Sequence, residues 1–233
     1  MILIHEAMNR GHTDMGWLKS DHSFSFGGFL DPTRMGYGAL RVINEDRIVP
    51  GSGFGEHGHQ DMDILTLVLS GELKHADTLG NIATIAPGDA QLMSAGSGIR
   101  HSEMNASDTN PAHFLQIWLI PETKGASPTY QQTALPLKDR STDWTLVASG
   151  DAGDKALQLL SDTRVSIAWP REGMTTQIPN DTGRIYFVQI IEGLATVEGE
   201  RLGAGDGLQI GAESMPDLQW VTDGQALLFD MHQ

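Results

Sequence analysis

Two short segments each carry a pair of side chains that can bind a metal ion. His57 and His59 stand one residue apart in "GFGEHGHQDMDILTLVLSG", and His101 and Glu103 stand one residue apart in "GSGIRHSEMNAS". Residues i and i+2 of a β-strand face the same side, so each pair can present two ligands to one ion. Three neutral imidazoles and one carboxylate suit Fe, Mn, Ni, Cu or Zn.

Each pair also has a simpler interpretation. His57 and His59 could be polar loop residues, and His101 and Glu103 could form a solvated ion pair on a surface strand. A His-x-His pair alone is a weak motif in a chain with nine histidines. A glycine-rich segment precedes both pairs, however, and this shared arrangement favours one metal site built from two strands.

Nearby carboxylates compete as ligands. Asp61 and Asp63 follow the first histidine pair closely, and Ile64 begins the apolar run after them. We therefore interpret Asp63 as a structural residue or as a hydrogen-bond partner that orients an imidazole.

The segments around these pairs predict an all-β fold. Short β-type runs bounded by Gly, Pro, Asn or Asp recur along the chain, and helical periodicity is scarce. Such spacing is typical of antiparallel sandwiches and barrels. "LSGELKHADTLGNIATIAPGDAQLM" in the first half is echoed by "IEGLATVEGERLGAGDGLQI" in the second, and the polar stretch at 121–143 lies between them. These signals predict two similar β domains.

Four further residues are candidates for a substrate pocket. His22 could be a hydrogen-bond partner of the site, or a satisfied polar residue at the start of a strand. Phe24 and Phe26 alternate and could line an aromatic pocket, although core packing is the simpler interpretation. Met93 precedes the second glycine-rich turn and could form a cavity wall, with core packing again the simpler interpretation.

Composition excludes several classes of protein. The net charge of −15 and the absence of a Lys/Arg-rich run argue against direct binding to nucleic acid. The chain has no cysteine, which excludes disulfides and thiolate-bound metals. It has no apolar run of the ~20 residues that a membrane span needs and no signal-like amino terminus. We expect a cytoplasmic protein.

At this point the motifs resemble a known family. The spacing of Gly51, His57, His59 and Gly71 is similar to the first cupin motif, and "GIRHSEMN" is similar to the second. "RGHTDMGWLKSDHSFSFGGFLDP", "GALRVINEDRI", "MSAGSGIRHSE" and "QIWLIP" resemble signatures of the pirin family, especially of its bacterial members associated with quercetin 2,3-dioxygenase activity. The resemblance is strong over residues 10–121 and mainly architectural beyond them.

The resemblance implies a bicupin, in which two antiparallel β-barrel or jelly-roll cupin domains pack together. We expect an N-terminal metal-binding domain at 1–130 and a C-terminal metal-free domain at 131–233, where no histidine occurs before His232. The family's metal ligands fall on the following residues of this sequence: His57, His59, His101 and Glu103. The expected cofactor is one mononuclear divalent metal, Fe(II) first, with Zn, Ni, Mn or Cu as alternatives.

By the same resemblance, the expected function is that of a metal-dependent dioxygenase, an oxidoreductase that opens quercetin-like flavonols with O2 and releases carbon monoxide. Glu103 is the expected acceptor of the proton from the 3-hydroxyl group. The alternative is a non-enzymatic regulatory protein that docks on a protein partner according to the metal's oxidation state. A third interpretation is an isomerase that uses the metal as a Lewis acid. We expect a monomer whose partners are a small phenolic substrate and O2.

Overall fold

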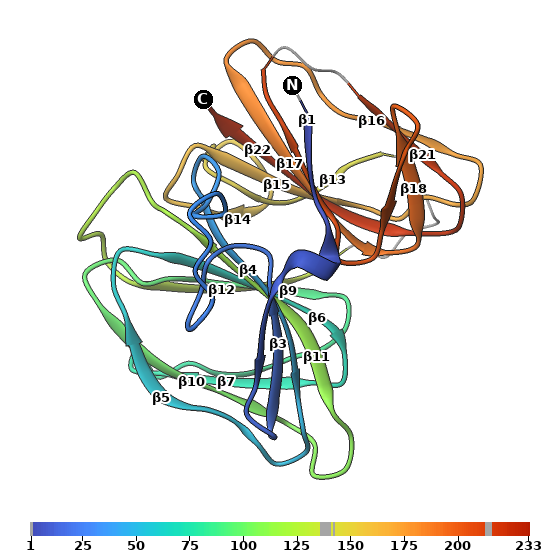
Figure 1. The fold of residues 1–233 in the computed structure, drawn as a ribbon. Coiled ribbons are helices and arrows are strands. Elements are labelled where there is room, and N and C mark those ends of the chain that lie inside the picture. The colour runs from blue at the N-terminus through green and yellow to red at the C-terminus, as the bar shows by residue number, and fades with distance from the viewer. Residues whose placement is uncertain (1, 136–140, 142, 213–215) are drawn as a thin grey trace.

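The chain folds almost entirely into β-strands. The computed structural model describes residues 2–135, 141, 143–212 and 216–233, and in these it contains strands β1 to β22 and one short 3-10 helix, Ala7–Asn9. Figure 1 shows two barrels, one built mainly from the first half of the chain and one from the second. No helix of the described residues is long and apolar enough to cross a membrane. The predicted all-β bicupin architecture is confirmed.

The first barrel contains a seven-stranded sheet, in the order β12-β9-β6-β11-β4-β3-β2, and a four-stranded sheet, β5-β10-β7-β8. All of its strand pairs are antiparallel. The strands are β2 (Gly11–Asp14), β3 (Leu18–His22), β4 (Leu40–Ile48), β5 (Gly53–His59), β6 (Asp63–Ser70), β7 (Leu73–Asp77), β8 (Ile82–Ile85), β9 (Asp89–Ser94), β10 (Ile99–Asn105), β11 (Ala112–Leu119) and β12 (Thr129–Ala134).

The second barrel repeats this architecture with a seven-stranded sheet, β1-β20-β17-β22-β15-β13-β14, and a four-stranded sheet, β16-β21-β18-β19. Only the β13–β14 pair among its described strands is parallel. The strands are β1 (Ile2–His5), β13 (Thr145–Ser149), β14 (Leu157–Gln158), β15 (Thr163–Ala168), β16 (Thr175–Gln177), β17 (Arg184–Glu192), β18 (Leu194–Val197), β19 (Glu200–Gly203), β20 (Gly207–Ile210), β21 (Asp217–Trp220) and β22 (Gln225–His232).

The two barrels share one large hydrophobic core. Leu65 and Leu115 of the first seven-stranded sheet belong to the same buried cluster as Phe187 and Phe229 of the second. The two large sheets therefore pack against each other, and the apolar area that they bury stabilises the pair of domains.

Strand β6 explains why parts of the sequence lack polar alternation. Its side chains are buried on both faces from Asp63 to Val68. Leu65 and Leu67 belong to the core between the barrels. Ile64 and Val68, which point the other way along the strand, belong to separate clusters of the first barrel. A strand covered on both sides reads as a nearly continuous apolar run, as "ILTLVL" does with Thr66 as its one polar residue.

The interior of the second barrel is packed with apolar side chains. Val188, Ile190, Leu228 and Trp220 belong to one buried cluster there. The indole Nε1 of Trp220 donates a hydrogen bond of 3.0 Å to Thr176 Oγ1, which satisfies the one polar atom of that large ring. This interior is therefore a structural core.

The first strand of the chain belongs to the second barrel. β1 pairs with β20 of the second barrel, although β2 and the strands that follow it belong to the first. At the other end of the first half, β12 pairs with β9. The predicted division at residue 130 stays a prediction, and of the stretch at 121–143 that suggested it, residues 136–140 and 142 lie outside the described residues.

Candidate metal centre

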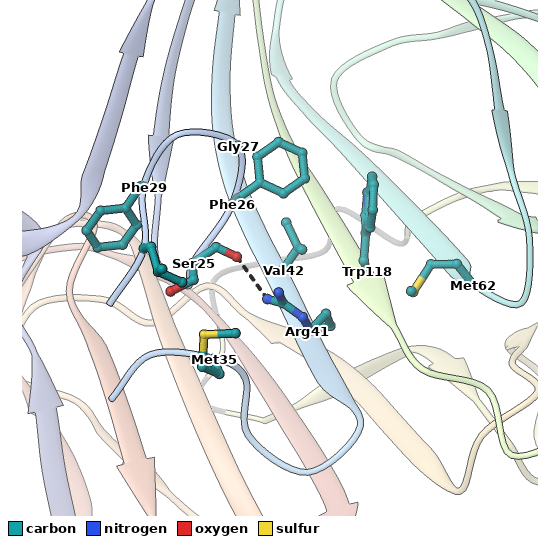
Figure 2. Close-up of a pocket in the computed structure, with 10 residues that line it drawn as sticks. Ser25, Phe26, Gly27, Phe29, Met35, Arg41, Val42, Met62 and Trp118 are labelled. Atoms are coloured by element: carbon teal, nitrogen blue, oxygen red, sulfur yellow. Dashed lines mark hydrogen bonds between the residues drawn. The ribbon is translucent and has the colours of Figure 1, made fainter. Parts of the chain in front are cut away.

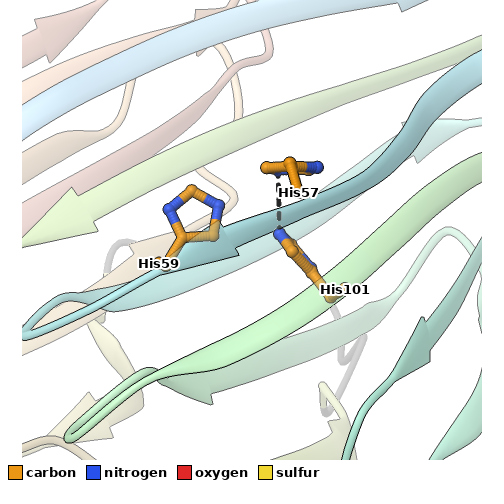
Figure 3. Close-up of side chains that lie close together, drawn as sticks. All are labelled: His57, His59 and His101. Carbon is orange, nitrogen blue, oxygen red and sulfur yellow. Dashed lines mark hydrogen bonds between the residues drawn. The ribbon is translucent and has the colours of Figure 1, made fainter.

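Three histidines meet inside the first barrel. His57 and His101 are direct partners in the antiparallel pairing of β5 with β10, and His59 pairs with Ile99 on the same two strands. The ring nitrogens available as ligands all lie within 4.8 Å of one another. Figure 3 shows the three imidazoles converging, with Nε2 of His57 and Nε2 of His101 3.1 Å apart. The i, i+2 spacing of His57 and His59 brings both rings to one face of β5.

A backbone contact determines which nitrogen of His57 can bind a metal. Its Nδ1 lies 2.9 Å from the carbonyl oxygen of Gly55. A carbonyl oxygen can only accept, so Nδ1 carries the proton and donates it. In the neutral ring, Nε2 then keeps its lone pair and points toward His101.

Burial keeps two of the three imidazoles neutral. Burial, with the neighbouring His57, lowers the pKa of His59 to about 4. Burial, followed by the nearby His57, His59 and His75, lowers the pKa of His101 to about 3. Protons therefore do not compete with a metal for these two nitrogens at neutral pH.

The arrangement fits a single metal ion. Imidazole nitrogens lie about 2.1 Å from a bound zinc ion, so two ligands of one such ion can be no more than about 4.2 Å apart. The 3.1 Å between the two Nε2 atoms is already within this limit. The largest separation, 4.8 Å, needs only a small rotation of a ring.

Glu103 is buried on the same side of β10 as His101, two residues further along the strand. It pairs with His75 of β7, while His101 pairs with Asp77. Its Oε2 accepts a 2.6 Å hydrogen bond from Gln116 Nε2, and its Oε1 is buried without a partner among the described residues. The three-histidine cluster does not include Glu103. Its assignment as fourth ligand therefore stays a prediction.

The carboxyl group of Glu103 holds its proton unusually strongly. Burial raises its pKa to about 7; the hydrogen bond from Gln116 opposes this rise, and the negative charge of Asp46 adds to it. Burial likewise raises the pKa of Asp46 to about 7. A second carboxyl group whose pKa burial raises to near neutral thus adds to the raised pKa of Glu103.

A belt of buried polar side chains faces this region from the larger sheet. Gln116 of β11 pairs with Asn44 of β4 and with Thr66 of β6, and Thr66 pairs with Gln91 of β9. All four are buried. Sequence reasoning missed them, because they lie far apart in sequence and only the pairing of four strands brings them together. A polar residue that interrupts an apolar stretch, as Gln116 does in "FLQIWL", was the one local signal.

Another histidine lies beside the cluster. His75 of β7 is fully buried, and its ring centroid is 5.4 Å from that of His101. Its Nε2 lies 2.9 Å from Oδ2 of Asp77, and both side chains are inaccessible to solvent. The His-x-Asp spacing of β7 was the signal for this pair, since it repeats the i, i+2 pattern of the other two strands.

The four predicted pocket residues occupy different environments. Met93 is fully buried and packs with Ile64. Phe24 packs against Phe187 of the second barrel, with ring centroids 5.3 Å apart. Phe26 instead contacts Trp118, at 5.4 Å. The two phenylalanines do not share a face, because β3 ends at residue 22 and the chain beyond it turns.

His22 is held by protein partners on both ring nitrogens. Its Nε2 lies 2.8 Å from Thr13 Oγ1, and its Nδ1 lies 2.8 Å from Asn44 Oδ1. An amide oxygen accepts, so Nδ1 is the donor in the second contact. Burial lowers the pKa of His22, and the ring is neutral at neutral pH. Its contact with Asn44 links it to the polar belt.

The two carboxylates beside the first histidine pair accept hydrogen bonds from backbone amides of segments far along the chain. Asp61 Oδ1 accepts a 2.7 Å hydrogen bond from the amide of Gly125. Asp63 Oδ2 accepts a 2.7 Å hydrogen bond from the amide of Leu160, in the second half of the chain. The expectation that Asp63 is structural agrees with this contact, and no imidazole is hydrogen-bonded to it among the described residues.

Two packed antiparallel barrels, one of them with a cluster of three histidines on paired strands, define a bicupin with a candidate metal centre. The pirin family model matches residues 4–119, and the model of the quercetinase C-terminal cupin domain matches residues 146–231. The chain belongs to the pirin family.

Relatives cover the whole chain. It is 42% identical to the quercetin 2,3-dioxygenase of Escherichia coli K12, over 99% of both chains. It is 40% identical to a pirin-like protein of Caulobacter vibrioides, over 94% of this chain and 95% of that one. The crystal structure of the bacterial pirin YhhW of Escherichia coli in complex with nickel(II) superimposes with a TM-score of 0.94 at 40% identity, covering 100% of this chain and 99% of that one. These names agree with the expected oxidoreductase.

Proposed function

We propose that this chain is a metal-dependent dioxygenase that cleaves quercetin-like flavonols with O2. One observation carries the proposal: three imidazoles, two of them held neutral by burial, converge within 4.8 Å beside a buried carboxyl group. The names of the relatives supply the reaction class, because a fold alone does not specify chemistry.

In this proposal the metal is held by His57, His59 and His101, with Glu103 as the fourth ligand. Fe(II) is the proposed ion, and Zn, Ni, Mn or Cu are alternatives; the related YhhW structure contains nickel. When bound, the metal supplies a Lewis-acidic position that favours the ionised form of a hydroxyl group and gives O2 a place to react.

Glu103 is the proposed acceptor of the proton from the 3-hydroxyl of the flavonol. In the site without a metal, burial raises its pKa to about 7, so its carboxyl group can exchange a proton near neutral pH, as a general base must. Oε2 accepts the hydrogen bond from Gln116, and Oε1 has no partner among the described residues. Because each carboxylate oxygen has two lone pairs, Glu103 keeps the capacity both to bind the metal and to take the proton.

Carbon monoxide release tests the proposal. The wild-type chain, loaded with Fe(II) and supplied with quercetin and O2, is expected to release one CO for each quercetin consumed. Glu103→Gln is expected to lower kcat by about 100-fold or more, the usual range for loss of a general base. Glu172→Gln, an exposed glutamate of the second half, is the matched control and should match the wild type. A fully metallated wild type that releases no CO would reject the proposal.

The alternative, a metal- and redox-responsive regulatory binding protein, gives a different result in the same samples. It predicts no phenolic turnover and a protein partner whose binding differs between the ferrous and ferric states. An isomerase that uses the metal as a Lewis acid would turn over without O2. The monomeric state and the cytoplasmic location stay predictions of the sequence.

A further inference from the structure

An aromatic cavity of about 370 Å³ adjoins the metal centre. Phe26, Met62 and Trp118 line it, and Leu30 and Met35, which are 73% and 46% exposed, lie at its rim. Flat apolar walls of this kind suit a planar aromatic ligand. The exposed apolar rim gives such a ligand a surface on which to enter.

Trp118 forms the wall between this cavity and the metal centre. Its ring centroid is 5.0 Å from that of His59 and 5.4 Å from that of Phe26. Its Nε1 donates a 3.2 Å hydrogen bond to Gln116 Oε1, and Gln116 in turn donates to Glu103. A ligand in the cavity therefore touches Trp118, which contacts the histidine cluster directly and is linked to the buried carboxyl group of Glu103 through Gln116.

One cation lies among these apolar side chains. Figure 2 shows Arg41 between Met35 and Trp118, with its Nη1 donating a 2.9 Å hydrogen bond to the carbonyl oxygen of Ser25. No carboxylate forms an ion pair with Arg41 within the described part of the chain. In a chain of net charge −15, Arg41 is thus an arginine beside an aromatic cavity without a carboxylate partner among the described residues, and its planar guanidinium suits an anionic oxygen.

A β-bulge places this arginine. In the pairing of β11 with β4, Trp118 is opposite Val42 and Leu119 is opposite Leu40, so Arg41 is the extra residue. Bulges of this type redirect a side chain from the position that regular alternation would give it. Val42 continues into the barrel wall and lines the same cavity as Arg41.

A second hollow lies beside His59, and its arginine has a carboxylate partner. It has a volume of about 440 Å³ and is lined in part by His59, Gly98 and Arg100. The guanidinium of Arg100 is already engaged, because its Nε lies 2.8 Å from Glu56 Oε1. Arg100 is therefore a natural comparison for Arg41: it is also an arginine beside the site, but its charge is compensated.

We propose that Arg41 recognises an anionic oxygen on a planar aromatic ligand held in the cavity lined by Phe26 and Trp118. This inference rests on the proposed function, since it names the class of substrate that the same site prefers: flat aromatic compounds with a carboxylate or an ionised phenol away from the metal-binding hydroxyl. Besides the bond from Nη1 to Ser25, the guanidinium has Nη2 and Nε without a partner among the described residues, so it can donate to such an oxygen.

A matched pair of probes tests the inference. Naphthalene-2-carboxylate and naphthalene-2-carboxamide have the same ring and differ in charge. Their binding to the full chain is measured by quenching of tryptophan fluorescence in low-salt buffer, as purified and again after chelation. The wild type is expected to bind the carboxylate about tenfold more tightly in both samples, the ratio that one hydrogen bond to a charged group supplies.

Arg41→Met keeps the apolar stem and removes the charge. It is expected to abolish the preference for the carboxylate while the carboxamide binds as in the wild type, which also reports that the cavity is intact. Arg41→Lys restores the charge without the planar fork and should recover part of the preference. Arg100→Met, in the other hollow, should retain the full preference.

Three results would overturn the inference: a wild type that binds neither probe or does not discriminate between them, a preference that persists in Arg41→Met, or a preference that disappears in Arg100→Met. The outcome is separate from that of the dioxygenase proposal. A protein that releases no CO from quercetin but prefers the carboxylate through Arg41 rejects only the reaction. A protein that releases CO without this preference rejects only the role of Arg41.

Discussion

Gln116 Nε2 donates a hydrogen bond of 2.6 Å to Oε2 of Glu103 inside the first barrel. The orientation of the Gln116 amide is consistent with its other contact, because its Oε1 accepts from Trp118 Nε1 at 3.2 Å. A donor on one carboxylate oxygen favours the ionised form of Glu103 and so opposes the effect of burial on its pKa. We therefore expect the affinity of the site for a metal to depend on Gln116, although Gln116 is not one of the proposed ligands.

Gln116→Leu tests this dependence. Removing the donor raises the pKa of Glu103 above its present value of about 7, so protons compete more strongly with a metal at neutral pH. We expect metal affinity at pH 7 to fall by about 10- to 100-fold, the usual effect of losing such a partner. The loss should shrink at pH 9, where Glu103 ionises in both proteins. Metal titrations at the two pH values measure this, and Gln177→Leu, an exposed glutamine, should show neither change. An equal loss at both pH values would contradict the explanation.

The three histidines make a direct prediction about metal content. His57→Ala, His59→Ala and His101→Ala should each lower metal affinity by more than the ~10- to 100-fold effect of an outer partner. Elemental analysis of the purified proteins, together with competition against a chelator, measures the change. His12→Ala removes a more exposed imidazole of β2 and should leave about one metal per chain, as in the wild type. If two of the three site variants bound metal normally, the site would have to lie elsewhere.

The buried pair of His75 and Asp77 predicts a loss of stability. Asp77 also accepts hydrogen bonds from the backbone amides of Leu79 and Asn81. Asp77→Ala leaves His75 buried without its partner and removes these two bonds, so we expect a loss of about 3 kcal/mol in the free energy of unfolding. Urea denaturation measures it. Asp108→Ala, on the surface, should change the free energy by less than about 0.5 kcal/mol.

Glu45 predicts a dependence of stability on pH. Burial tends to raise its pKa, but hydrogen bonds from His113 and Arg10 and the nearby charges of Arg10 and Arg47 outweigh burial and hold the pKa well below the usual range. Because the folded-state pKa is lowered, the stabilisation is complete above the usual pKa of 4.5 and is lost as pH falls below it.

Glu45→Gln should therefore cost about 2 kcal/mol at pH 7, since hydrogen bonds to a charged group are lost. Urea denaturation at pH 7 and pH 3 should give a smaller difference between the two proteins at the lower pH. A difference that stays constant, or grows toward pH 3, would show that Glu45 does not keep its lowered pKa in the folded chain.

The histidine cluster could be predicted from the sequence because the features that indicate it lie within short segments of the chain. The spacing of His57 and His59 sets which face of a strand they share, and the glycine-rich turns indicate where the strands begin. The partners of the cluster could not be predicted in this way. Gln116 and Trp118 reach the site only through the pairing of β11 with its neighbours, and a strand's register is set by contacts far apart in sequence.

The same reason explains where the sequence was misleading. Phe24 and Phe26 look like neighbours on one face of a strand, but the strand ends before them and the two rings pack on different barrels. His75 looks like an isolated polar residue until β7 pairs with β10 and brings it beside His101. The alternation of side chains predicts the face on which a residue lies only while the strand continues, and it does not predict which strands pair.

The pairing of β1 with β20 means that the two barrels are interlocked as well as packed together (Figure 1). A break in the backbone between β12 and β13 would leave two fragments that remain joined by four residue pairs of β-ladder. A second barrel expressed alone would instead expose the backbone of β20 as an open edge, which is a template for strand exchange with another chain. By covering the edge of β20, strand β1 thus protects the second barrel from self-association.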